Sequence, residues 1–305
     1  MTVSAVIPVR DLGELLEGAL ASLEAQSVPV DEVVLVDDGP SATIPEDPSR
    51  YRVVRSGGVG PYAARNLGWR AATGDVVLFL DARSRPRPRW AGELAALLAR
   101  EGVGLAGCDV HVVAGRSLAS RVAALEQPFA LGDYVGRAWF RPYLATCSLA
   151  VRREVLEATG GFAATRSGAD ADLCWRAQDL GWRLEAVPEV LLDWLPRDSC
   201  RDLLEQHYRY GRSNTHLRRA WAAAGAQQPV VPTWPAVARM AALAGMRTVY
   251  AVLRRREDRL LHSLVEAARV ATRLGVRRAV AEASALTPAA PATGPTTGPT
   301  TSEAA

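Results

Sequence analysis

Lysine is absent from the 305-residue chain, so arginine supplies all 36 of its basic side chains. They are nearly balanced by 33 aspartate and glutamate residues, which leaves a formal net charge of +3. Proteins that bind nucleic acid through its phosphates usually carry a clear excess of positive charge. The balance gives no general case for a nucleic-acid partner, and we expect none.

Cysteine is also scarce. The four cysteines, Cys108, Cys147, Cys174 and Cys200, lie far apart, and no two of them form a C-x-x-C pair. Structural zinc sites and disulfide frameworks need closely or regularly spaced cysteines. The spacing therefore argues against both and suits a reducing compartment.

The chain has no uninterrupted apolar run of the length that crosses a membrane. The nearest candidate, residues 240–253, is broken by Arg247. Met1 leads directly into a predicted strand at residues 3–7, without the basic and long apolar regions of a secretory signal. We therefore expect a cytoplasmic protein.

The chain does contain short apolar runs, rich in β-branched residues, that end in carboxylates. Residues 33–36 are followed by Asp37 and Asp38, and residues 76–80 by Asp81. Such runs are typical of strands buried in a parallel sheet. Ligands of open α/β sheets bind beyond the carboxyl ends of the strands. We therefore expect a ligand site at these carboxylates, although each could merely cap the following turn or helix.

Strand and helix signals alternate along the first two thirds of the chain. Strands are predicted at residues 3–7, 33–37, 51–54, 76–81, 103–113, 146–151 and 183–187, and helices at 61–72, 90–100 and from about 170. This order predicts an α/β fold with a doubly wound, mostly parallel sheet and helices on both faces. We assign residues 1–198 to this unit.

The rest of the chain has a different pattern. Residues 199–285 are predicted to be helical, and their arginines outnumber the acids and interleave with apolar residues. A basic amphipathic segment of this kind can lie on an anionic membrane surface, which would make the protein peripheral on the inner face of the membrane. Alternatively, it packs on the preceding unit with its arginines in water. Residues 286–305, rich in Thr, Gly and Pro, are predicted to be disordered.

Seven segments carry a resemblance to a known family. They are residues 4–10, 35–39, 64–68, 74–81, 148–155, 160–162 and 170–176. Their order and spacing resemble family 2 glycosyltransferases of the GT-A fold over roughly residues 3–190. The resemblance implies a nucleotide-diphosphosugar donor and transfer of the sugar, with inversion, to a hydroxyl of a glycan, lipid-linked or small-molecule acceptor.

The resemblance also implies roles for residues at the donor. Asp37 and Asp38 match the pair that receives the nucleotide, and Pro8, in the first matching segment, is expected beside the donor. Arg65 matches a basic residue near the donor, where a guanidinium can clamp phosphate or nucleobase. A surface ion pair is the alternative for Arg65.

Asp170 occupies the place of the family's catalytic base. Inversion needs one carboxylate to take the proton of the acceptor hydroxyl as it attacks the anomeric carbon. Asp170 could instead be the N-cap of a helix, and Asp172 could take either role. The acid that usually precedes the base is replaced by Ala169, which leaves open a weakened or inactive enzyme.

The metal-binding motif departs from the family pattern, because the usual acidic pair reads Asp81-Ala82-Arg83 here. A divalent cation, Mn²⁺ or Mg²⁺, held by Asp81, water and phosphates is one possibility. Alternatively, Arg83 itself stabilises the leaving diphosphate as a fixed cation. Further along, residues 206–212 resemble a basic, aromatic stretch of many relatives, in which Arg209 or Arg212 is expected at the donor phosphates or a charged acceptor.

Two other functions compete with this interpretation. Residues 58–63 match the G-x-G-x-x-A form of the dinucleotide fingerprint, with Asp81 near the place of the ribose-binding acid, which would suit an NAD-dependent oxidoreductase. The fingerprint normally follows the first strand of its sheet, whereas two βα units precede it here. The second competitor, suggested by Arg83 and Ala169, is a glycosyltransferase-like module that binds a nucleotide or glycan without turnover.

Overall fold

The structure is a computed structural model that describes residues 1–10, 13–40, 44–136 and 139–286. Its strands are β1 (Val3–Val9), β2 (Glu32–Asp37), β3 (Arg52–Arg55), β4 (Val76–Phe79), β5 (Ser84–Pro86), β6 (Val103–Val112), β7 (Ala150–Arg152) and β8 (Arg183–Trp194). Its α-helices are α1 (Glu14–Glu24), α2 (Pro61–Ala71), α3 (Trp90–Leu98), α4 (Leu118–Glu126), α5 (Arg153–Thr159), α6 (Ala169–Asp179), α7 (Cys200–Ala220), α8 (Trp234–Leu253) and α9 (Glu257–Leu286). The predicted disordered tail, apart from the end of α9, lies outside the described residues.

The strands form one eight-stranded sheet in the order β3-β2-β1-β4-β7-β6-β8-β5. The first four strands run parallel, as predicted. The other half is mixed, because β7 is antiparallel to both neighbours and β5 is antiparallel to β8. Although β5 follows β4 closely in the chain, it pairs at the far edge, so the sheet curls. The carboxyl ends of β1, β2 and β4 share one edge, where Asp38 and Asp81 follow.

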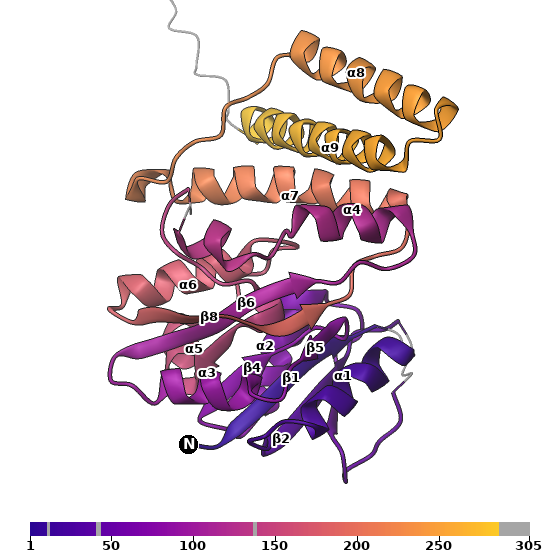
Figure 1. Ribbon diagram of the computed structural model, residues 1–305. Helices are drawn as coiled ribbons and strands as arrows, with labels where there is room; N and C mark the ends of the chain where they lie inside the picture. Colours follow the sequence, from indigo (N-terminus) through magenta and orange to yellow (C-terminus); the bar gives the residue numbers. More distant parts are fainter. Residues whose placement is uncertain (11–12, 41–43, 137–138, 287–305) are drawn as a thin grey trace, which may run out of the picture.

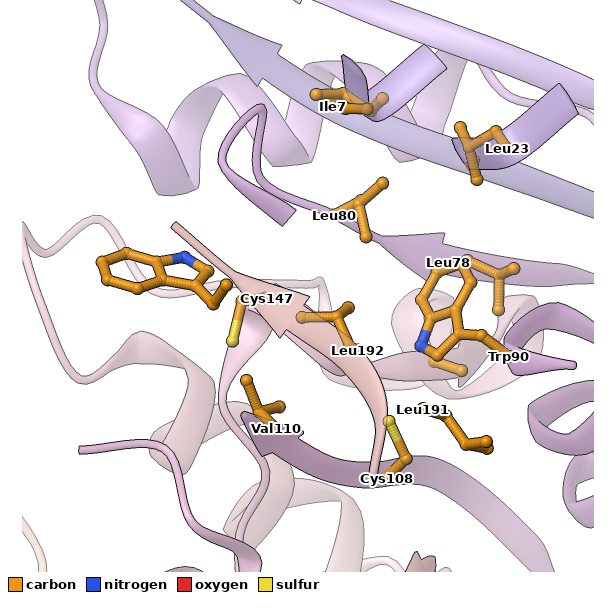
Figure 2. Packing of buried hydrophobic residues seen from close by; sticks show 14 of the residues in the cluster. Ile7, Leu23, Leu78, Leu80, Trp90, Cys108, Val110, Cys147, Leu191 and Leu192 are labelled. Atoms are coloured by element: carbon orange, nitrogen blue, oxygen red, sulfur yellow. The ribbon is translucent and has the colours of Figure 1, made fainter. Parts of the chain in front are cut away.

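Helices cover both faces of the sheet, which confirms the predicted α/β class. Alternate residues of a strand point to opposite faces. Ile7 of β1 packs with Leu23 of α1 and Trp90 of α3 in one cluster, which Figure 2 shows from close by. Its neighbour Val6 packs on the other face with Trp69 of α2. Because both faces are covered, β1, β2 and β4 are almost continuously apolar, whereas the edge strand β3 begins and ends with an exposed arginine.

Three predicted elements differ from the structure. Residues 146–148 form a 3-10 turn, and the strand β7 begins only at Ala150. The strand predicted at 183–187 continues to Trp194 as β8. The arginine-rich segment at residues 83–89, where the sequence predicts no strand, contains β5. There Ser84 and Pro86 are buried, whereas Arg87 binds Asp193 of β8. A pattern of arginine, serine and proline gives no strand signal, so only the pairing with β8 reveals it.

The C-terminal helices stack in layers above the sheet: α7 lies with α4, α9 lies on α7, and α8 is outermost (Figure 1). The α7–α9 crossing is close. A Cβ at Gly211 of α7 would lie 2.0 Å from the carbonyl oxygen of Thr272, and one at Gly275 of α9 would lie 2.0 Å from that of Tyr208. Both contacts are to backbone, so two glycines allow the helices to approach this closely.

Gly275→Ala therefore destabilises the protein, although alanine is intrinsically the better helix former by about 1 kcal/mol. Overpacking against backbone costs about 1–3 kcal/mol. Gly245 of α8 is the matched control, because a Cβ there meets nothing within 4 Å. In urea unfolding, we expect Gly275→Ala to lose stability and Gly245→Ala to match or exceed the parent. Equal stability of the two variants would contradict the close crossing.

Candidate active site at the sheet edge

Asp37 and Asp38, at the end of β2, are both buried and both hold neighbouring loops. Asp37 accepts hydrogen bonds from the amides of Gly39 (3.1 Å) and Ile44 (3.3 Å) and pairs with Arg55. Buried carboxylates need such donors, because an unpaired buried charge is costly. The carboxylate that ends β2 therefore fixes the loop that follows it.

Asp38 is bound in the same way to the loop after β3. It accepts from the hydroxyl of Ser56 at 2.6 Å and from the amide of Gly60 at 3.1 Å. Gly60 has a φ of 93°, a conformation that side-chain-bearing residues rarely adopt. Gly60 belongs to the candidate dinucleotide fingerprint at residues 58–63, and its amide is therefore already bound to Asp38. The strand β3 that precedes it is an edge strand, separated from the Asp81 strand β4 by β2 and β1.

Arg65 of α2 forms an ion pair with Asp81 beyond the end of β4. The arginine is buried, whereas the Asp81 side chain is 32% exposed. The Nη1 of Arg65 donates to the carbonyl of Pro61 at 3.3 Å, and the Arg65 guanidinium lies 5.5 Å from the centroid of the Tyr62 ring. The Nε of Arg65 is buried and has no acceptor within the part of the chain that the structure describes. The site thus holds a fixed cation, Arg65, whose Nε–H donor has no acceptor among the described residues.

The residues around Asp81 do not fit a metal ion held by the protein. Among the described residues, no three His, Cys, Asp or Glu side chains cluster as a metal site. Asp81 is already paired with Arg65. Arg83 stands where the second acid would be, and its Nη1 donates to the carbonyls of Pro196 (3.0 Å) and Leu195 (3.4 Å). Burial, and then the charge of Arg197, lower the pKa of Arg83. An arginine nevertheless stays charged.

Asp170 lies in the first turn of α6 and is not its N-cap, since Gly168 occupies that position. Its Oδ1 accepts from the hydroxyl of Tyr62 at 3.1 Å, and its Oδ2 accepts from the amide of Thr146 at 3.3 Å. Burial raises the pKa of the Asp170 carboxyl, while those hydrogen bonds and the charge of Arg65 act in the opposite direction. A carboxyl with a raised pKa and access to solvent is suited to accept a proton.

Asp172, two residues further along α6, has both carboxylate oxygens engaged. Its Oδ2 pairs with Arg176 at 2.8 Å, and its Oδ1 accepts from the indole of Trp221 at 3.0 Å. These bonds tie α6 to the residue that follows α7. The two acids that sequence alone leaves as equals therefore differ in surroundings. Asp172 is bound to a guanidinium and an indole, and Asp170 to a neutral hydroxyl and to the amides of Thr146 and Ala171.

The two arginines predicted on α7 face different neighbours. Arg209 lies 5.8 Å from the centroid of the Tyr210 ring. Arg212 instead pairs with Glu282 of α9 at 2.9 Å. The structure thus directs Arg212 into the helical layer. In the same segment, burial and the charge of Asp170 raise the pKa of the Tyr210 phenol. Pro8 lies in β1 opposite Val36 of β2, just before the ligand edge.

Sequence reasoning missed a group of tyrosines around Asp170, which we call the tyrosine cluster. Its members are Tyr62, Tyr134, Tyr143 and Tyr210. Burial first, and the negative charge of Asp170 in addition, raise the pKa of every one of these phenols. They therefore remain neutral hydroxyl groups. Only Tyr62 had a usable signal, because it lies one helical turn before Arg65.

Comparison with known proteins places these features in a family. Residues 4–174, more than half of the chain, match the family described as glycosyl transferase family 2. The pre-mycofactocin glycosyltransferase of Mycobacterium tuberculosis is 31% identical over 226 residues, which are 70% of this chain and 47% of the relative. The chain therefore spans about half the length of that relative.

Two solved structures share the fold. The mannosyltransferase PcManGT from Pyrobaculum calidifontis, in complex with GDP-Man and Mn²⁺, is 21% identical with a TM-score of 0.55, covering 87% of this chain and 85% of its own. The glucosyl-3-phosphoglycerate synthase of M. tuberculosis, in complex with Mn²⁺, UDP-glucose and phosphoglyceric acid, is 21% identical with a TM-score of 0.50, covering 76% and 82%. At this identity, the likeness is one of GT-A fold.

The family match covers the segment of the chain that holds the strands β1 to β7 and the carboxylates at the sheet edge. The chain belongs to glycosyltransferase family 2.

Proposed function

We propose that the protein transfers a sugar from a nucleotide-diphosphosugar to an acceptor hydroxyl with inversion, and that Asp170 is the base. One observation carries the proposal: α2 links the donor edge to that carboxylate. Its Tyr62 binds Asp170, and Arg65, on the next turn of the same helix, binds Asp81 at the end of β4. Residues far apart in the chain are thereby held in one continuous network.

In this mechanism, the Asp170 carboxylate takes the proton of the acceptor hydroxyl. The acceptor oxygen then attacks the anomeric carbon, and the bond from that carbon to the diphosphate oxygen breaks. Negative charge grows on the diphosphate, so a fixed cation beside it lowers the barrier. Arg65, with its spare buried donor, supplies that charge, and Arg83 and Arg209 are further candidates.

Asp37 and Asp38 are the proposed nucleotide receivers. Both sit at the ligand edge, and both already accept hydrogen bonds from loop amides or hydroxyls. A nucleobase N–H or a ribose hydroxyl offers the same kind of donor, so donor binding exchanges some of these bonds for others. The donors in the two related structures, GDP-Man and UDP-glucose, support this class of ligand.

The acceptor is proposed to approach along an aromatic surface beside α6. Trp175 of α6 makes edge-to-face contacts with Trp139 (5.2 Å between centroids), Phe140 (5.0 Å) and Trp221 (5.5 Å), and it lies 5.9 Å from Tyr143 of the tyrosine cluster. Trp175 itself is fully buried, whereas Trp139, Phe140 and Trp221 around it keep part of their surface exposed. Such broad, rigid side chains suit the faces of a sugar or a similar ring. A glycan, a lipid-linked sugar or a small molecule all remain acceptor candidates.

The competing functions have less support. A dinucleotide site needs the Gly60 amide for pyrophosphate, yet that amide binds Asp38. A non-catalytic module needs no carboxyl with a raised pKa, yet Asp170 has one. The transferase interpretation accounts for both groups.

Asp170→Asn removes the proton acceptor and keeps the shape of the side chain. We expect nucleoside diphosphate release from a panel of UDP- and GDP-sugars to fall by about a hundred- to ten-thousand-fold, with little change in melting temperature. Asp172→Asn is the matched control and loses its ion pair with Arg176, so it lowers stability more than rate. A near-normal rate in Asp170→Asn would move the base to Asp172.

The pH dependence tests the Tyr62 contact. Asp170 works when deprotonated, so kcat/KM falls as the pH drops through its raised pKa. Tyr62→Phe removes a hydrogen bond that lowers this pKa, so the acid limb of the profile shifts to higher pH. Tyr250→Phe, on the outermost helix, is the control and leaves the limb in place. An unshifted limb in Tyr62→Phe would separate this tyrosine from the base.

Metal removal tests the role of the arginines. Because Arg83 replaces an acid and Asp81 is paired, we expect turnover to survive EDTA at least in part. Arg83→Asp restores the acidic pair and should make the rate respond to added Mn²⁺. Complete loss of the wild-type rate in EDTA, with recovery on adding Mn²⁺ or Mg²⁺, would show that the arginines do not replace the ion.

A further inference from the structure

The outermost helix, α8, presents large apolar side chains to solvent. Its buried residues are small or β-branched and recur every seventh position, at Val237, Ala244 and Ala251. This seam packs on α9. On the rest of its surface, which we call the α8 face, large apolar side chains stay exposed, although Arg277 lies 4.1 Å from the centroid of the Trp234 ring and Arg259 lies beside Tyr250. The exposed members of this face are Trp234, Leu243, Met246, Val249, Tyr250, Val252 and Leu253.

Cations border one end of the α8 face. Arg254 and Arg255 follow α8 directly, and Arg259 lies in the first turn of α9. None of these three arginines has a carboxylate partner within the described part of the chain. The guanidiniums of Arg254 and Arg259 lie 5.9 Å and 5.5 Å from the ring centroid of Tyr250. Apolar and cationic groups therefore meet on one surface.

A hollow of about 470 Å³ opens between α8 and α9 at the same end. Met246 and Tyr250 of the α8 face line it from one side, and Arg259 and His262 of α9 line it from the other. Arg247, Ser263 and Glu266 complete its walls, so an apolar surface lies beside basic groups and one carboxylate, which pairs with Arg247. Such a hollow suits a group that carries an anionic head on an apolar stem.

We propose that the α8 face is the docking surface for an anionic lipid bilayer, with the helix lying in the membrane interface and the arginines on lipid phosphates. A bilayer offers apolar chains and negative charge together, which is the complement of this surface. A second copy of the chain fits less well. A twofold interface pairs a patch with itself, and α8 contains no acidic residue to meet the arginines.

The helix is proposed to lie on the bilayer rather than cross it. By length and composition, α8 is the one described helix that could span a membrane. However, Arg247 interrupts its apolar sequence and pairs with Glu266 of α9. If α8 crossed the membrane, it would lose the Arg247–Glu266 ion pair and its packing on α9. Lying flat keeps both and still covers the α8 face.

Vesicle cosedimentation of the full-length protein tests the proposal without any activity assay. We expect binding to vesicles of phosphatidylcholine with phosphatidylglycerol, weak binding to phosphatidylcholine alone, and loss of binding as salt screens the charges. Each arginine near an anionic surface contributes about a fivefold factor in partitioning. Arg254→Ser/Arg255→Ser should therefore weaken binding by more than tenfold. Met246→Ser/Leu253→Ser should also weaken it.

Matched controls separate this surface from general charge and apolar exposure. Arg100→Ser/Arg183→Ser changes the net charge equally at the far end of the sheet, and Leu180→Ser removes an exposed leucine from α6; both should bind as the parent does. Three results would overturn the proposal. They are equal recovery in the supernatant with and without anionic lipid, a stable dimer that Met246→Ser/Leu253→Ser dissociates, and resistance to alkaline carbonate extraction, which marks a spanning helix.

Discussion

Negative charge at the ends of buried strands is the constraint on which the site depends. A carboxylate with little water around it must be met by donors, or it destabilises the fold. Loop amides, a hydroxyl and Arg55 donate hydrogen bonds to Asp37 and Asp38, and Arg65 pairs with Asp81. The loops and the helix α2 are positioned by these bonds, so the same charges that need pairing also shape the edge where we propose that the donor binds.

The helix α2 transmits this arrangement to the proposed base. Pro61 begins the helix, Tyr62 reaches Asp170, and Arg65 reaches Asp81 one turn later. Burial raises the pKa of Asp170, and a neutral hydroxyl from Tyr62 contacts its carboxylate rather than a second charge. At Asp172 the corresponding contact is a guanidinium, that of Arg176. The uncharged hydroxyl at Asp170 and the guanidinium at Asp172 thus distinguish the proposed proton acceptor from a structural ion pair.

The sequence predicted those features of the fold that depend on a local pattern of residues. Apolar runs such as residues 33–36 identified the parallel strands and, through the carboxylates behind them, the ligand edge. It could not separate Asp170 from Asp172, because both lie in one helical turn and the difference comes from Trp221, 49 residues further along. Nor could it find β5, which pairs with β8 more than 100 residues away, or Tyr134 and Tyr143, whose phenols are affected by the charge of Asp170 only in the fold.

The central claim is that a nucleotide-diphosphosugar binds at the carboxyl ends of β2 and β4. Ligand that binds only the native state raises the melting temperature by mass action. The direct measurement is a thermal-shift titration of the protein with a panel of nucleotide-diphosphosugars, beside NADH. The account predicts a concentration-dependent rise with at least one nucleotide sugar and none with NADH. Stabilisation by NADH alone, or by no nucleotide sugar at millimolar concentration, would contradict it.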